Sequence, residues 1–127
     1  MTDGAISTDA APKPVAAYSQ AKRKGNILQL AGQVGIDPAT GSVVDGGVAE
    51  QTRQTLANLE AVLAAAGASM ADVVMMRVYL TDTAHFTELN ATYNELVGEP
   101  YPARTTVYVG LPDGLLVEID ALAVLDS

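Results

Sequence analysis

The C-terminal part of the chain constrains the fold most, because it contains two β-type segments separated by a tight turn. The first spans about Ala103 to Gly110, the second spans about Leu116 to Leu125, and Leu111-Pro112-Asp113-Gly114 lies between them. In the second segment apolar and charged residues alternate, which is typical of a strand that covers a core with one face. The first segment begins with one arginine, Arg104, and the second contains one glutamate, Glu118.

Three further elements are predicted upstream of these strands. Ile27–Val34 is short, apolar and bounded by turn residues, which favours a buried strand. Val48–Ala66 carries apolar residues at helical spacing and is followed by Gly67, a residue suited to a left-handed helix end. Val73–Leu80 is the next strand, and one of its faces is wholly apolar: Val74, Met76, Val78 and Leu80.

A second amphipathic helix is predicted after Leu80. Asp82 or Thr83 can cap it, Gly98 can end it, and its apolar residues follow helical spacing: Phe86, Leu89, Tyr93 and Leu96. The order of elements predicts an α+β fold in which two helices pack on one face of a mixed sheet. The other face then has to close on itself or meet another subunit.

The composition describes one domain and excludes several kinds of chemistry. The chain has 127 residues, of which we expect 1–14 to form a flexible tail and 15–127 to form a single domain. It has no Cys and only one His, so no thiol nucleophile and no His or Cys metal site is expected. A net charge of −8 opposes binding to nucleic acid. No segment resembles a signal peptide or a membrane span, so we expect a cytoplasmic protein without a membrane partner.

Five motifs, in order and at compatible spacing, resemble those of the RidA family of imine and enamine deaminases, also called YjgF/YER057c. The resemblance covers about Tyr18 to Val124, and its motifs are Tyr18–Ala21, Gly32–Pro38, Gly46–Thr52, Asn90–Tyr93 and Pro102–Ile119. It implies a chorismate-mutase-like α+β fold assembled as a homotrimer, with sites between subunits. It also implies a cofactor-free hydrolysis of 2-imino acids, such as 2-iminopropanoate (from 2-aminoacrylate) and 2-iminobutanoate, to 2-keto acids and ammonia.

The resemblance assigns roles to six residues of this chain. Arg104 matches the arginine that binds the substrate carboxylate, and a guanidinium can hold a carboxylate by two parallel hydrogen bonds. Glu118 is the candidate for placing water and transferring protons, as a partly desolvated carboxyl can do. The remaining positions match the family's ligand pocket: Tyr18, Gly32, Asn90 and Thr106.

Other interpretations of these residues stay open. Arg104 could form a structural ion pair with Asp120 or Glu118, and Glu118 could be no more than that partner. The chain could then be a non-catalytic module that binds small carboxylates, or a chaperone-like member of the family. A ribonuclease activity, attached to some relatives, suits an acidic chain poorly. Ala31 stands where many members have Ser or Thr, so the substrate side chain is left open.

Overall fold

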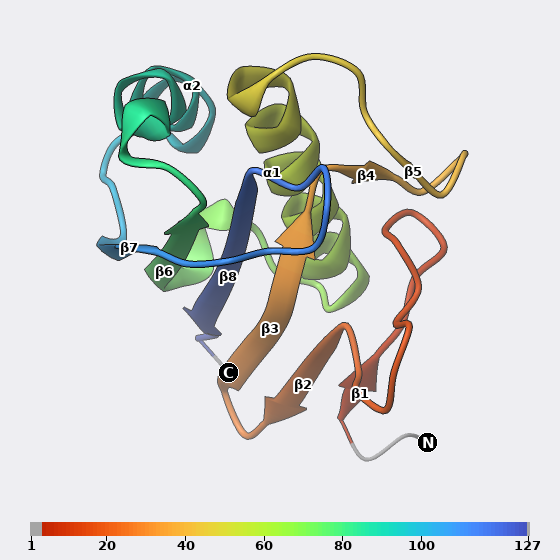
Figure 1. The fold of residues 1–127 in the computed structure, drawn as a ribbon. Coiled ribbons are helices and arrows are strands. Elements are labelled where there is room, and N and C mark those ends of the chain that lie inside the picture. The colour runs from red at the N-terminus through yellow and green to blue at the C-terminus, as the bar shows by residue number, and fades with distance from the viewer. Residues whose placement is uncertain (1–3, 127) are drawn as a thin grey trace.

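A computed structural model describes residues 4–126 as one six-stranded sheet with two helices on one face (Figure 1). The sheet order is β1-β2-β3-β8-β6-β7, and every pairing is antiparallel except the parallel pairing of β6 with β7. This mixed sheet confirms the predicted α+β class. The strands are β1 (Ala5–Ile6), β2 (Ala21–Lys24), β3 (Ile27–Val34), β6 (Val73–Leu80), β7 (Ala103–Tyr108) and β8 (Val117–Val124); the helices are α1 (Val48–Ala65) and α2 (Phe86–Val97).

Smaller elements connect these layers. A separate two-stranded ribbon consists of β4 (Ile36–Asp37) and β5 (Ser42–Val43), and short 3₁₀ turns span Met70–Asp72 and Thr83–His85. The Asp82 side chain accepts a hydrogen bond from the Ala84 N–H, so the predicted cap is present at the 3₁₀ turn that leads into α2. No helix within residues 4–126 has the length and apolarity that crossing a membrane requires.

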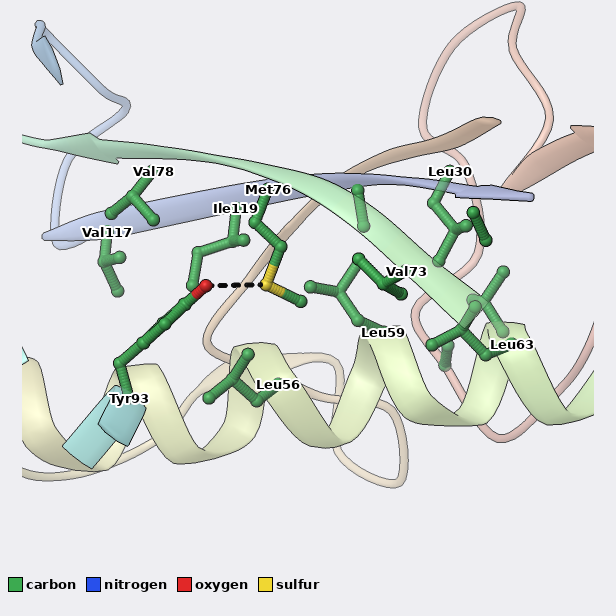
Figure 2. Packing of buried hydrophobic residues seen from close by; sticks show 14 of the residues in the cluster. Leu30, Leu56, Leu59, Leu63, Val73, Met76, Val78, Tyr93, Val117 and Ile119 are labelled. Carbon is green, nitrogen blue, oxygen red and sulfur yellow. Dashed lines mark hydrogen bonds between the residues drawn. The ribbon is translucent and has the colours of Figure 1, made fainter. Parts of the chain in front are cut away.

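Helix α1 forms the main wall of the core. Its N-terminus is closed by Glu50, whose carboxylate accepts a hydrogen bond from the Gly47 N–H at 2.8 Å, and it ends before Gly67, which has a φ of 75°. Leu56, Leu59 and Leu63 are fully buried against the sheet (Figure 2). Each such leucine stabilises the fold by about 1.5–3 kcal/mol relative to an exposed one.

A buried glutamine of α1 fixes the turn between β7 and β8. The Gln51 amide donates to the Gly114 carbonyl at 2.8 Å, and its oxygen accepts from the Leu116 N–H at 2.9 Å. Both groups of one buried side chain are therefore used on a single turn, as burial of an amide requires. This contact determines where β8, and with it Glu118, begins.

The predicted apolar face of β6 is correct at three of its four positions. Met76, Val78 and Leu80 are fully buried, but Val74 is 47% exposed and Val73 is buried in its place. The pairing of β6 with β8 slips between Val73 and Met75, so one residue of β6 has no partner on β8. Such a bulge reverses the alternation for the residues that precede it, which a periodicity argument cannot detect.

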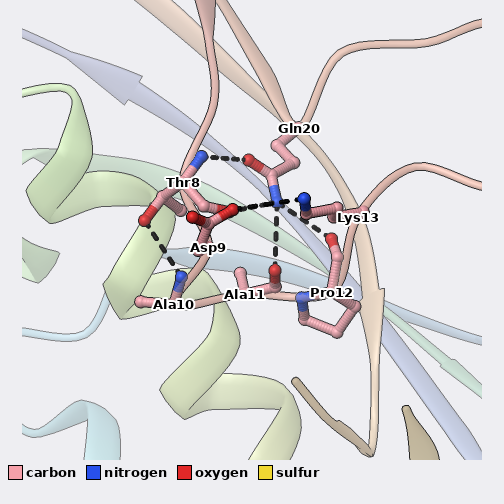
Figure 3. Close-up of polar contacts among 7 residues, drawn as sticks. All are labelled: Thr8, Asp9, Ala10, Ala11, Pro12, Lys13 and Gln20. Carbon is pink, nitrogen blue, oxygen red and sulfur yellow. Dashed lines mark hydrogen bonds and ion pairs between the residues drawn. The ribbon is translucent and has the colours of Figure 1, made fainter. Parts of the chain in front are cut away.

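The predicted tail over residues 1–14 differs from the structure over most of its length. Residues 1–3 lie outside the described residues, but β1 pairs with β2 and Ala11 is buried. Gln20 holds this segment, as Figure 3 shows: its amide oxygen accepts from the Thr8 N–H, and its amide nitrogen donates to the carbonyls of Thr8, Ala11 and Pro12. One buried side chain thus provides the partners that the segment's backbone lacks, and the ordered chain begins before residue 15.

Strand β8 separates the two faces of the sheet. Val117, Ile119, Ala121 and Ala123 are fully buried towards the helices, as the alternation predicts. The intervening side chains, Glu118, Asp120, Leu122 and Val124, lie on the face that no helix covers. This open face is partly charged and partly apolar.

Candidate active site

Arg104 projects from β7 to the helix side of the sheet. It is paired in register with Met76, whose side chain is buried beneath the helices, and paired residues share a face. Its Nε–H donates to the Thr106 hydroxyl at 2.8 Å, and its Nη2 donates to the Asn90 amide oxygen at 2.6 Å. Thr106 lies two residues along the same strand and Asn90 belongs to α2. The structure therefore brings together three of the six predicted site residues.

Two aromatic rings of α2 hold the guanidinium in place. Its carbon lies 4.7 Å from the centroid of the Tyr93 ring and 5.8 Å from that of Phe86, within the range of a cation–π interaction. Tyr93 is itself fixed, because its hydroxyl donates to the Met76 sulfur at 3.3 Å (Figure 2). Burial lowers the pKa of Arg104, an effect that Tyr93 and Tyr108 oppose, and an arginine remains charged in this situation.

The guanidinium keeps donors for a ligand. Two of its five N–H groups are used by Thr106 and Asn90, and within residues 4–126 no carboxylate pairs with it. An open depression of about 380 Å³ adjoins it and is lined by Phe86, Asn90, Tyr93, Asn94, Tyr101, Pro102 and Arg104. Among the described residues this half-buried, oriented cation has no counter-ion, an arrangement that suits an anionic ligand.

Glu118 lies on the other face of the same sheet. It pairs with Tyr79 of β6 on one side and Val34 of β3 on the other. Burial, and then the negative charge of Asp120, raise the pKa of the Glu118 carboxyl above its usual value. The acid is therefore half-buried and more readily protonated than a surface glutamate, as proton transfer near neutral pH requires.

Gly32 leaves the space that the Glu118 carboxylate occupies. It lies at a bulge of β3, between Leu30 and Gln33, where the pairing with β8 slips. A Cβ at this position would overlap the Glu118 Oε2 atom and lie 3.0 Å from its Cδ. Glycine is therefore required here because a larger side chain would overlap the Glu118 carboxylate. Bulges of this kind are frequent next to active sites.

Arg104 and Glu118 are separated by the sheet within one copy of the chain. The alternative of an ion pair between them is therefore wrong for a single copy, and so is a pair with Asp120, which Arg77 and Tyr79 bind instead. Tyr18 lies in the loop before β2 and is 49% exposed.

Comparison with known proteins decides the family. Residues 8–125 match the family model described as endoribonuclease L-PSP. The crystal structure of RidA from the Antarctic bacterium Psychrobacter sp. is 42% identical and superposes with a TM-score of 0.90, covering 94% of this chain and 98% of that one. The chain belongs to the RidA family.

Relatives in the RidA family carry names of two kinds. A RutC family protein of Pyrococcus horikoshii is 50% identical over 119 residues, which cover 93% of this chain and 94% of the relative. The 2-iminobutanoate/2-iminopropanoate deaminase of Dermatophagoides farinae is 38% identical over 122 residues, which cover 95% of each. The family thus includes proteins named for imine deamination.

The aromatic residues around Arg104 in this RidA-family protein were not among the predicted site residues. Phe86 and Tyr93 lie on the apolar face predicted for the second helix. Tyr93 is buried in the core, Phe86 is 40% exposed, and both rings also face Arg104. Tyr101, beside them, belongs to no periodic segment. The available signal was the spacing of Phe86, Asn90 and Tyr93 at i, i+4 and i+7, which places an amide and two rings on one helix face.

Proposed function

We propose that this chain is a cofactor-free deaminase that hydrolyses small 2-imino acids to 2-keto acids and ammonia. The observation that carries the proposal is the state of Arg104, which is oriented by Asn90 and Thr106, stacked on Tyr93 and, within residues 4–126, without a carboxylate partner. A related chain that is named for this activity, the deaminase of Dermatophagoides farinae, supports the assignment.

The substrate carboxylate would take the N–H donors that Arg104 keeps free. Two parallel hydrogen bonds to a charged fork position the acid and its adjacent C2 atom in one plane. Thr106 and Asn90 determine how the guanidinium points, and the Tyr93 ring prevents it from turning away. Tyr18, which is not among the residues that contact Arg104 in one copy, would complete the pocket.

Glu118 would carry the chemical step. Its ionised carboxylate takes a proton from a water molecule while the water oxygen bonds to C2 of the imine, and the C=N pair of electrons moves to nitrogen. The protonated Glu118 then returns the proton to that nitrogen, which gives a carbinolamine. Glu118 next takes the proton of the C2 hydroxyl and passes it to the amino nitrogen, the C–N bond breaks, and ammonia leaves with a keto group at C2. The sum is imine plus water giving ketone plus ammonia, with Glu118 regenerated. Gly32 provides the room in which the carboxylate turns.

Because the two residues lie on opposite faces, a site that uses both must take them from two copies. We therefore propose that Glu118 acts on a substrate bound by Arg104 of a neighbouring copy. The open face provides a surface for assembly, since Ile27 is 52% exposed and Val124 is 38% exposed there beside charged groups. A closed ring is the natural result of such a two-sided contact, which favours the homotrimer implied by the family resemblance and its chorismate-mutase-like fold.

A second function is favoured by the independence of the Arg104 site. All its contacts come from β7 and α2, so a single copy could bind a small carboxylate without Glu118. The chain would then be a non-catalytic binding module for a keto acid or similar anion, or a chaperone-like member of the family.

One assay separates the two functions. An amino-acid oxidase generates 2-imino acids in the presence of semicarbazide, and a deaminase suppresses the semicarbazone that forms. We expect wild type and Arg53→Ala, a control at an exposed ion pair with Glu95, to suppress it equally, and Arg104→Ala to fail. Suppression that is equal in Arg104→Ala and wild type would refute the deaminase. A wild type that binds a keto acid through Arg104 but suppresses nothing would be the binding module.

A further inference from the structure

Three polar side chains form a connected group beside Glu118 on the open face. Arg77 Nε donates to Asp120 Oδ1 at 2.9 Å, and the Tyr79 hydroxyl donates to Asp120 Oδ2 at 2.9 Å. Both oxygens of the carboxylate are therefore engaged, one by a cation and one by a phenol. The Asp120 side chain is only 13% exposed, whereas that of Arg77 is 51% exposed.

The register of the sheet places this group next to Glu118. Tyr79 is paired directly with Glu118, and Arg77 is paired directly with Asp120. Asp120 follows Glu118 by two residues, hence on the same face and about 7 Å away along the strand. Tyr79 thus lies beside Glu118 on the neighbouring strand, Asp120 lies two residues further along β8, and Arg77 lies beside Asp120.

No other described strand next to this group brings a charge to this face. Strand β3 contains no titratable residue, and Val34 is the partner it offers to Glu118. Strand β7 presents Thr105 and Val107, the register partners of Arg77 and Tyr79, while its Arg104 points to the helix side. In the proposed assembly Arg104 of a neighbouring copy would also approach Glu118, and it would do so equally in every variant considered below.

The charges of this group act on Glu118 in opposite directions. An ionised Asp120 disfavours a second negative charge nearby and raises the pKa of Glu118, in addition to the effect of burial. Arg77 compensates Asp120 through its ion pair at one carboxylate oxygen, and the Tyr79 hydroxyl binds the other oxygen. Without Arg77, the full charge of Asp120 would act on Glu118.

We propose that Arg77 and Asp120 are positioning residues that set the pH range over which Glu118 exchanges its proton. Neither touches the Arg104 site, and Glu118 remains the group that reacts. The link to turnover rests on the proposed deaminase function, whereas the link to the titration of Glu118 does not. The pair therefore determines at which pH the carboxylate is ionised and able to accept a proton from water.

The direct test is a titration of the Glu118 carboxyl by carbon-13 NMR, with its resonance assigned by its loss in Glu118→Gln. Asp120→Asn should lower the midpoint, because it removes a negative charge and leaves Arg77 uncompensated. Arg77→Gln should raise the midpoint, and Arg77→Lys, which keeps the charge, should restore most of it. Each shift should be about half a pH unit at low ionic strength and smaller at high salt.

The double variant Arg77→Gln with Asp120→Asn returns the local charge to neutral and should titrate near wild type. Midpoints that stay constant, or that move in the same direction in Asp120→Asn and Arg77→Gln, would overturn the proposal. Should Asp120→Asn fail to fold, the half-exposed Arg77 variants decide alone.

The activity readout separates this proposal from the function on which it rests. The acidic limb of the deaminase rate should move with the NMR midpoint, upwards in Arg77→Gln and downwards in Asp120→Asn. If the midpoints move as expected while Glu118→Gln keeps full activity, the catalytic role of Glu118 fails and the electrostatic coupling stands. If activity depends on Glu118 but neither midpoint nor limb moves, the coupling fails and the function stands.

Discussion

The two faces of the sheet carry two different halves of a site. On the helix side, Arg104 donates hydrogen bonds to Thr106 and Asn90 and lies against an aromatic ring of its own chain, so one copy is enough to orient it. On the open side, Glu118 has a raised pKa and reserved space at Gly32, and the guanidinium of Arg77 on that face is paired with Asp120. One copy thus positions Arg104 on one face of the sheet and Glu118 on the other, and the proposed reaction needs two copies to bring them together.

The most direct test that the site takes Arg104 and Glu118 from two copies is to mix two variants, each of which lacks one of these residues. Arg104→Ala should lose about 10³-fold in kcat/KM, because two charge-assisted hydrogen bonds to the substrate are gone. Glu118→Gln should lose about 10²-fold in kcat, the scale of general acid–base catalysis. When equal amounts are unfolded and reassembled together, sites with both intact residues should reappear. In random trimers, about a quarter of the sites would have both, giving about a quarter of wild-type activity.

The control for this mixture pairs two variants of the same side, Arg104→Ala and Arg104→Gln. This pair should recover nothing, because no combination restores the arginine. Failure of the first mixture to recover, with assembly verified by light scattering, would mean that both residues act from a single copy.

Gly32→Ala tests the open side alone. The added Cβ would displace the Glu118 carboxylate, and a misplacement of about 1 Å can cost about 10²-fold in kcat. Binding of a keto acid to Arg104, measured by calorimetry, should be unchanged. Gly25→Ala, at a surface turn far from Glu118 in the sheet, is not a matched control because Gly25 has a φ of 60°. Gly110→Ala is the matched control, because a Cβ added there meets no atom within 4 Å and the backbone φ is not positive; it should leave kcat near wild type.

Tyr93 tests the helix side in the same manner. Tyr93→Leu removes the ring beneath Arg104 and should raise KM about 10-fold, the scale of a partly desolvated cation–π contact. Tyr93→Phe keeps the ring and loses only the hydrogen bond to Met76 sulfur, so its KM should stay near that of wild type. Equal KM values for the two variants would show that the ring does not hold the guanidinium.

Much of this fold could be predicted because its elements follow single periods. The strands Ile27–Val34 and Val73–Leu80 have the predicted bounds, and the first helix is shorter by one residue. Errors arose where a long-range contact replaces a local pattern. The bulge at Val74 depends on β8, and the position of residues 8–12 depends on Gln20, a residue whose own sequence neighbourhood gives no sign of this role.

The candidate site residues were predicted from the sequence, whereas the arrangement of these residues in the sheet was not. Arg104 and Glu118 were found through their motif, but which face each occupies follows from the partners of β7 and β8 in the sheet. The strands are consecutive in sequence, and β6 lies between them. Parallel pairing of β7 with β6 then directs Arg104 towards α2, which no local pattern of Pro102–Ile119 reveals.

The smallest effect concerns the stability of the open side as a function of pH. Burial raises the folded-state pKa of Glu118, so the folded chain binds this proton more tightly than the unfolded chain does. The resulting stabilisation is fully present below the unfolded-state pKa of about 4.3 and is lost as pH rises through the folded-state pKa. At neutral pH the ionised Glu118 therefore opposes folding. Solvent screening keeps this effect small because the carboxyl is only half-buried, so Glu118→Gln should raise Tm by no more than about 2 °C. The increase in Tm should vanish as pH falls towards 4, where the wild-type side chain is also neutral at this position.

Thermal unfolding followed by circular dichroism between pH 4 and 8 measures this increase in Tm, with Glu60→Gln on the exposed side of α1 as the matched control. If the increase in Tm of Glu118→Gln instead grows towards acid pH, the fold stabilises the ionised carboxylate. Glu118 would then not be the destabilised acid that distinguishes the open face from the Arg104 side.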